Sequence, residues 1–142
     1  MQTVYLIQSD AFPSFNCEVE GVNHDCGDHS VFGKRLAEWL HDGLTAKGWD
    51  ITDCFAEDWG WTVELKHPGR FPFFVGCSNV DAGPDDPPGQ YFRIFTEPET
   101  PQFRRWFRKH DISDQLGRLT RDLSAMIEAD PRIALIANQD DW

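Results

Sequence analysis

Residues 61–67 alternate between apolar and polar side chains. Trp61, Val63 and Leu65 occupy every second position, and polar or charged residues lie between them. Successive side chains of a β-strand point to opposite faces of the sheet, so this pattern predicts a strand with one buried face. A sheet built on such a strand needs a second layer on its apolar side.

Further segments also favour strands. Residues 3–8 are apolar at both sets of alternate positions, which predicts a central strand covered on both faces. The tetrapeptide 67–70 has Pro second and Gly third, the chemistry of a type II turn, so a hairpin should follow 61–67. The remaining predicted strands are 49–55, 71–77, 91–96 and 132–137, and 15–20 is compatible with a half-exposed strand.

Residues 31–47 carry the clearest helical pattern. Apolar side chains at positions 32, 36, 39, 40 and 44 recur at helical spacing, while charged residues occupy the other side. Ser30 or Asp28 is placed to cap the N-terminus, and Gly48 lies where a left-handed C-cap residue is expected. The pattern therefore predicts one long amphipathic helix.

Two more helices are predicted towards the C-terminus. Residues 113–129 place their leucines and isoleucines on one stripe, and Pro131 ends the pattern. A shorter helix over 102–110 is indicated by Thr100 as a cap and Pro101 at the first helical position. Its aromatic residues have helical spacing, so they would form the buried side while its four basic residues face water.

The order of these elements favours a two-layer α+β sandwich. Short turns join consecutive strands, so the sheet should be mostly antiparallel, with about five to six strands. Two longer helices and one short helix would pack on one face. The 142 residues show no repeat or linker and fit a single domain over 1–142, with an acidic, exposed loop over 80–90.

The charge of the chain restricts its partners. A formal net charge of -11, from 24 acidic and 13 basic residues, argues against binding to nucleic acid or an anionic membrane. It favours a basic partner, or it serves solubility alone. Residues 1–8 lack a basic region and a long apolar run, and no segment approaches the roughly 20 apolar residues of a membrane span. A cytoplasmic location and reduced cysteines are the expectation.

Standard catalytic frameworks are absent from the sequence. It contains no Walker loop, no dinucleotide-binding glycine motif, no G-x-S-x-G elbow and no H-E-x-x-H, and no cofactor is expected. The densest set of metal-ligand residues is Cys17, His24, Cys26 and His29, which suits zinc in ligand type but matches no common zinc spacing. A ligand-rich loop of this kind is more often a solvated turn.

A catalytic thiol has little support in the sequence. Cys26 or Cys54 could pair with a histidine, but a reactive thiolate needs cationic neighbours or a helix N-terminus. Asp53 and Glu57 lie close to Cys54 instead, and Cys26 also has acidic flanks.

Glu57 and Asp58 form a conspicuous acidic pair. Adjacent residues of a strand point to opposite faces, so these carboxylates cannot share a proton unless the backbone turns between them. The Asp58-Trp59-Gly60 segment is typical of a turn or bulge.

The segment 32–79 resembles small uncharacterised bacterial proteins. The matching motifs are Gly-x-x-Ile at 48–51, Glu-Asp-Trp-Gly-Trp at 57–61 and an apolar-Gly-Cys-x-Asn motif at 75–79. Further matches lie at 95–98 and 129–133. What the resemblance implies is compatible with immunity or inhibitor proteins, which are often small, acidic, cytoplasmic α+β domains, and the resemblance transfers no established activity.

The leading interpretation is a non-enzymatic, acidic protein-binding domain. It would neutralise a basic protein partner, such as a bacterial toxin, through steering by its acidic surface and burial of exposed tryptophans. The alternative is a small metal- or thiol-dependent enzyme that uses the cluster at 24–29. The predicted partner-binding residues are Glu57, Asp58, Trp59, Trp61, Asp81, Asp85 and Asp86.

Overall fold

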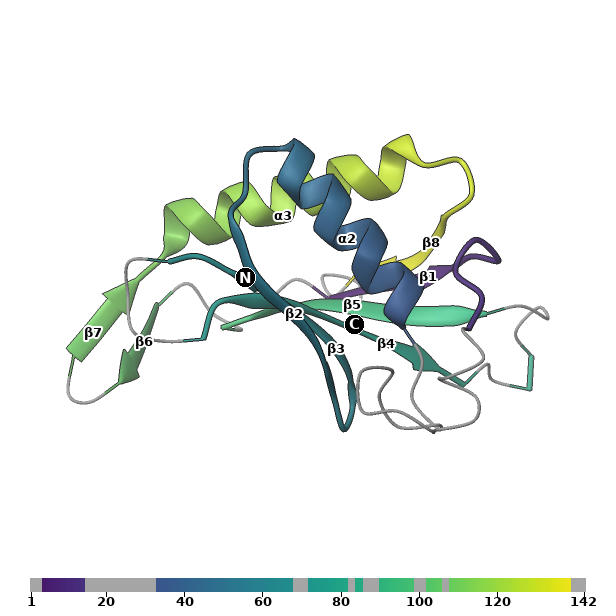
Figure 1. Cartoon of the computed structure of the whole chain (residues 1–142), viewed down its shortest axis with the longest axis horizontal. Helices are drawn as coiled ribbons and strands as arrows, with labels where there is room; N and C mark the ends of the chain where they lie inside the picture. The colour runs from purple at the N-terminus through teal and green to yellow at the C-terminus, as the bar shows by residue number, and fades with distance from the viewer. Residues whose placement is uncertain are drawn as a thin grey trace.

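An antiparallel sheet organises the computed structural model, which describes residues 4–14, 33–67, 72–81, 84–85, 90–98, 102–105 and 108–138. Six strands of this part of the chain, which Figure 1 labels, pair in the order β2-β3-β4-β5-β1-β8. Every neighbouring pair is antiparallel. The strands are β1 (Val4–Gln8), β2 (Ile51–Glu57), β3 (Gly60–Leu65), β4 (Phe74–Val80), β5 (Tyr91–Glu97) and β8 (Ala134–Asn138).

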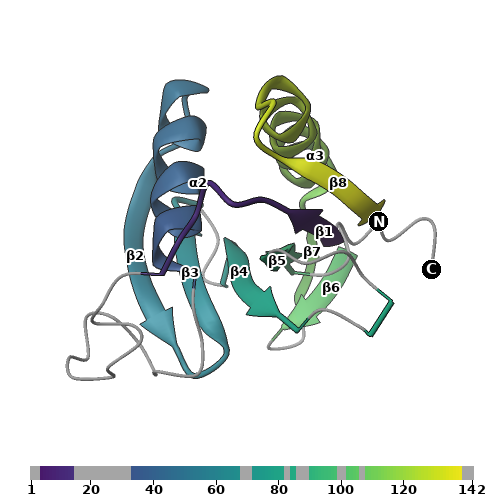
Figure 2. The same cartoon turned by 90° about the vertical axis from the view of Figure 1, so that its right-hand side faces the viewer.

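Two helices of the described residues cover one face of this sheet. Helix α2 (Lys34–Ala46) lies against β2, β3 and β4, and α3 (Ser113–Ala129) contacts β8 at the other side of the sheet. Figure 2 shows the helices side by side on the same face. The α+β class, the antiparallel sheet and the two long helices are thereby confirmed, and β1 is an inner strand, as its apolar sequence predicted.

The core lies between the helices and the sheet. Its fully buried side chains come from alternate positions of the strands and from one stripe of each helix. They include Tyr5 and Ile7 of β1, Val63 of β3, Val75 of β4, Ile94 of β5, Leu36, Leu40 and Leu44 of α2, and Leu116, Leu119 and Leu123 of α3.

The prediction of a short helix over 102–110 is wrong. This segment contains two short strands, β6 (Gln102–Arg105) and β7 (Arg108–Asp111), which pair with each other as a separate antiparallel hairpin. A segment this short spans little more than two helical turns, so spacing alone separates helix from strand poorly. Its aromatic residues favour strands, and an isolated helix of this length is marginal.

Helix α2 begins later than its sequence pattern predicted. Gly33 occupies the N-cap position with φ 149°, a conformation that residues with a side chain rarely adopt, and no side chain caps this end. The predicted caps Asp28 and Ser30 therefore do not hold the N-cap position, and both lie outside the described residues, as do the predicted strand at 15–20 and the turn after His67.

The C-terminal end of α2 agrees with the prediction. Gly48 has φ 93° and donates its backbone N–H to the carbonyl oxygen of Thr45 at 3.0 Å. The N–H of Trp49 reaches the carbonyl oxygen of Leu44 at 3.0 Å. This pair of hydrogen bonds is the Schellman arrangement, in which a left-handed glycine turns the chain out of the helix and satisfies its last carbonyls.

Two helical glycines allow a matched stability test. A methyl group on Gly117 of α3 would meet only the end of Arg121 at 3.6 Å, whereas one on Gly43 of α2 would lie 2.3 Å from the terminal carbon of Met126. Gly117→Ala should raise the free energy of unfolding by about 0.5–1 kcal/mol, because alanine loses less backbone entropy in a helix. Gly43→Ala removes the same penalty but forces Met126 to repack, so it should gain less or lose stability. Urea denaturation of both variants checks this, and equal gains would contradict the α2–α3 contact.

Candidate functional site

The sheet has a second face, here called the far face, which is turned away from α2 and α3. Residues directly opposite each other on paired strands point to the same side, so the register defines this face. One row across it contains Phe55, Thr62, Gly76, Phe95 and Val4. Phe55 and Phe95 are half-buried, so this face presents aromatic surface as well as polar groups.

Trp59 extends this aromatic surface from the turn between β2 and β3. Its ring stacks on Phe74 with centroids 6.2 Å apart and an interplanar angle of 21°. It also packs on Phe95, with centroids 5.2 Å apart. We call Trp59, Phe74 and Phe95 the aromatic cluster. Its tryptophan is half-buried, so part of the indole remains in contact with water.

Two glycines make room for the aromatic cluster and its turn. A Cβ atom on Gly76 would lie 2.3 Å from the ring of Phe95, so only glycine lets that ring lie flat against β4. A Cβ atom on Gly60 would lie 2.1 Å from the carbonyl oxygen of Cys77, and its φ is 156°. The close approach of rings to backbone on this face therefore depends on residues without a side chain.

Carboxylates border the aromatic cluster. Asp53 of β2 lies directly opposite Glu64 of β3 on the far face. The Asp53 carboxylate accepts the backbone N–H of Cys54 at 2.8 Å, and that of Glu64 accepts the Thr52 hydroxyl at 2.9 Å. Glu57 and Asp58 are exposed at the adjoining turn. Within the described residues neither of these two carboxylates has a hydrogen bond or an ion pair. The one described cation in this part of the face, Arg93, lies over the ring of Phe95 at 4.8 Å.

Only some of the predicted partner-binding residues lie together on the surface. Glu57, Asp58 and Trp59 share the β2–β3 turn beside the far face, and Asp81 and Asp85 are exposed after β4. Since β4 ends beside the start of β3, both acidic segments leave the sheet at the same end. Trp61 points to the helix side and is 5% exposed, so its ring offers no binding surface. Asp86 lies outside the described residues.

Sequence reasoning missed Phe55, Phe74 and Phe95 as members of this surface. The available signal was that aromatic residues occur at both sets of alternate positions in and beside β4 and β5, as at 73 and 74 and at 92 and 95, which indicates aromatic residues on both faces. The sequence could not show that Gly76 of β4 makes room for the ring of Phe95, on which Trp59 of the β2–β3 turn packs. These residues come from separate strands and meet only in the folded sheet.

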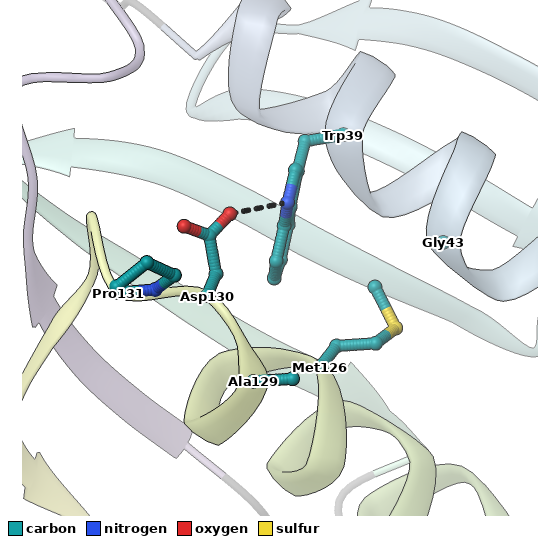
Figure 3. Close-up of a pocket in the computed structure, with 6 residues that line it drawn as sticks. All are labelled: Trp39, Gly43, Met126, Ala129, Asp130 and Pro131. Carbon is teal, nitrogen blue, oxygen red and sulfur yellow. Dashed lines mark hydrogen bonds between the residues drawn. The ribbon is translucent and has the colours of Figure 1, made fainter.

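A cavity of about 400 Å³ lies on the helix side (Figure 3), lined by Trp39, Gly43, Met126, Ala129, Asp130 and Pro131. Most of its wall is hydrocarbon. Its one charged side chain, Asp130, is engaged by Trp39 and Arg132. The cavity therefore offers no unpaired charge for a ligand and belongs to the packing of α2 against α3.

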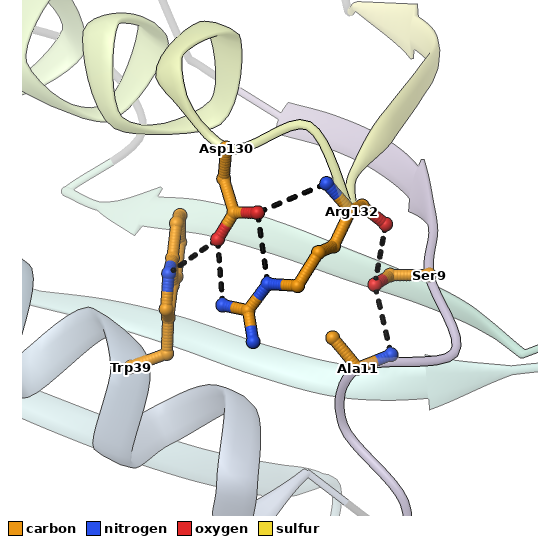
Figure 4. A network of polar contacts seen from close by, with 5 residues as sticks. All are labelled: Ser9, Ala11, Trp39, Asp130 and Arg132. Atoms are coloured by element: carbon orange, nitrogen blue, oxygen red, sulfur yellow. Dashed lines mark hydrogen bonds and ion pairs between the residues drawn. The ribbon is translucent and has the colours of Figure 1, made fainter.

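Asp130 ties three segments together (Figure 4). Its carboxylate accepts hydrogen bonds from the indole Nε1 of Trp39 at 3.1 Å and from the Arg132 guanidinium at 2.9 and 2.7 Å. The backbone carbonyl of Arg132 in turn accepts from the Ser9 hydroxyl at 2.8 Å. The hydrogen bond from the Arg132 side chain is the main reason that the pKa of Asp130 falls from 3.8 to about 2. This network fastens the start of β8 to α2 and to the end of β1.

The thiol and metal alternatives gain no support from the described residues. Cys17, His24, Cys26 and His29 all lie outside them, so the predicted zinc cluster is untested, and no metal-binding group of side chains occurs in the described part. Burial raises the pKa of the Cys54 thiol, and Asp53 and Glu38 raise it further. This environment disfavours the thiolate that a nucleophile needs.

Comparison with known proteins gives no relatives. No family model matches the chain, and neither a curated protein nor a solved structure matches it. Among the described helices, neither has the length and apolar character that crossing a membrane requires.

Substitution at Gly76 tests the aromatic cluster. Gly76→Ala should displace the ring of Phe95 and cost about 1–3 kcal/mol, because a packed site is forced to expand. Trp59 rests on the same ring, so its indole N–H resonance should shift in an NMR spectrum. A variant with unchanged stability and an unchanged Trp59 resonance would contradict the packing of this face.

Asp130→Asn tests the polar network. The amide loses the charge-assisted bonds to Arg132, and since that guanidinium is half-exposed and screened, the loss should be about 1–2 kcal/mol. Asp42→Asn, at an exposed carboxylate of α2, is the matched control and should change stability little.

The acid dependence of the same variant follows from the lowered pKa. A carboxyl group whose pKa is lower in the folded state stabilises the fold above its unfolded value of 3.8, and this stabilisation disappears as the pH falls towards about 2. The difference in unfolding free energy between wild type and Asp130→Asn should therefore shrink across this interval. A difference that stays constant from pH 6 to pH 2 would contradict the assignment.

Proposed function

We propose that this chain is a non-enzymatic binding protein that neutralises a basic protein partner, as an immunity protein or inhibitor does. The observation that supports this most is the combination, at one end of the far face, of a half-buried aromatic cluster with the carboxylates of Glu57 and Asp58, which have no ion pair among the described residues. The net charge of -11 agrees with it, and the resemblance of segment 32–79 to small uncharacterised bacterial proteins is compatible with it.

Each part of this surface has a separate role in the proposed mechanism. The acidic field attracts a basic partner over long range and raises the rate of encounter, an effect that salt screens. Burial of the aromatic rings then supplies affinity, since tryptophan is a frequent hot-spot residue.

A rigid platform favours tight binding in this proposal. The cluster rests on the inner strands β4 and β5, which pair with each other along seven residues of each strand. A surface that is ordered before binding loses less conformational entropy when the partner docks.

Charge reversal tests the proposal. The double variant Glu57→Lys/Asp58→Lys should weaken the complex by about tenfold or more, chiefly through slower association, with the loss smaller at high salt. The partner is first captured at low salt from a lysate of the cells that express the chain, then purified, and binding is measured by surface plasmon resonance.

A second double variant controls for total charge. Asp42→Lys/Glu128→Lys changes the net charge by the same amount at exposed positions of α2 and α3, on the helix side. It should leave affinity close to that of wild type. The proposal fails if no protein is captured at low salt, or if the two double variants weaken binding equally.

A further inference from the structure

We infer that the β2–β3 turn is a subsite for an arginine side chain of the partner. The inference rests on the proposed function and adds the residue type that the partner would present. Glu57 pairs with Gly60, so Asp58 and Trp59 form the two-residue turn between them. The subsite is the exposed part of the Trp59 indole together with the carboxylates of Glu57 and Asp58.

The indole has surface available for a ligand. Trp59 contacts Phe74 and Phe95, and in the described part of the chain no third ring and no cation packs against it. These two contacts fix the plane of the indole while leaving it half-buried instead of fully covered. A fixed aromatic face is a favourable place for a cation, because no side-chain freedom is lost when the cation docks.

The carboxylates favour the same ligand. Glu57 and Asp58 directly precede Trp59 in the chain, and both are exposed. Neither forms an ion pair with a described residue, although Arg93 lies on the same face. A guanidinium stacked on the indole could therefore donate hydrogen bonds to a carboxylate without displacing a cation of the chain itself.

Arg93 shows that this aromatic layer accommodates a guanidinium. Its side chain extends over the ring of Phe95, with its guanidinium carbon 4.8 Å from the ring centroid. A planar, weakly hydrated guanidinium can stack and form a bidentate bond at once, whereas an ammonium is compact and strongly hydrated. The combination of ring and carboxylate therefore favours arginine over lysine.

Strand β2 lies at the edge of the described sheet, next to this turn. Its features favour recognition of a partner's side chain over the pairing of a partner's strand with this edge. The register of β2 is interrupted between Ile51 and Asp53. The carboxylate of Asp53 also accepts the backbone N–H of Cys54 at 2.8 Å. Bulges and charged residues on an edge strand hinder the pairing of a further strand.

Two short extended peptides test the inference on the full-length protein. One alternates threonine with arginine, and the other has lysine at the same positions and so carries the same charge. The arginine peptide should bind about fivefold more tightly by fluorescence anisotropy, the factor that corresponds to a cation–π difference of about 1 kcal/mol. Trp59→Leu should abolish this preference, Trp59→Phe should retain part of it, and Glu57→Gln/Asp58→Asn should weaken both peptides.

A second measurement does not depend on the stability of any variant. Titration of wild-type protein with the arginine peptide should shift the indole N–H resonance of Trp59, assigned by comparison with Trp59→Phe, and leave that of Trp39 on the helix side in place. Equal affinity for both peptides, absence of binding, or an unshifted Trp59 resonance would each overturn the arginine subsite. The proposed function would survive these results if charge reversal at Glu57 and Asp58 still weakened the natural complex, and it fails separately if no partner is captured.

Discussion

The apolar side of the sheet has to be removed from water, and the remaining architecture depends on how this is done. In the described residues α2 and α3 both lie on that side, where leucines of each helix meet alternate residues of β1, β3, β4 and β5. Burial of apolar area is the main favourable contribution to folding. Because both helices lie on one side, other interactions have to stabilise the far face.

The far face is stabilised by aromatic packing directly on the backbone. Gly76 allows the ring of Phe95 to lie against β4, and Trp59 folds back from its turn onto Phe95 and Phe74. Among the described residues, these contacts cover part of the sheet without a second helical layer. They also hold an indole at a fixed position beside exposed carboxylates, and this links the packing of the sheet to the proposed binding of a basic partner.

On the helix side, the two carboxylates that accept hydrogen bonds from tryptophans serve the fold. Asp130 uses both carboxylate oxygens for Trp39 and Arg132, and Asp122 accepts a hydrogen bond from Trp49 at 2.8 Å. The bonds from Trp39 and Trp49 each tie the first half of the chain to the C-terminal helix or its exit. Carboxylates engaged in this way are poorly suited to a partner, in contrast to Glu57 and Asp58.

Periodicity in the sequence determined the long helices, the strands of the sheet and its antiparallel character, because those signals are local and repeat over several turns or residues. It failed at 102–110, where a short aromatic segment fits both helix and strand and the hairpin β6–β7 forms instead. The sequence also marked Glu57, Asp58 and Trp59 as candidates by their composition alone. The alternation over 61–67 likewise placed Trp61 on the apolar side, where the structure buries it. Only the tertiary structure decided that Phe74 and Phe95 support Trp59, since this outcome depends on contacts between residues far apart in the chain.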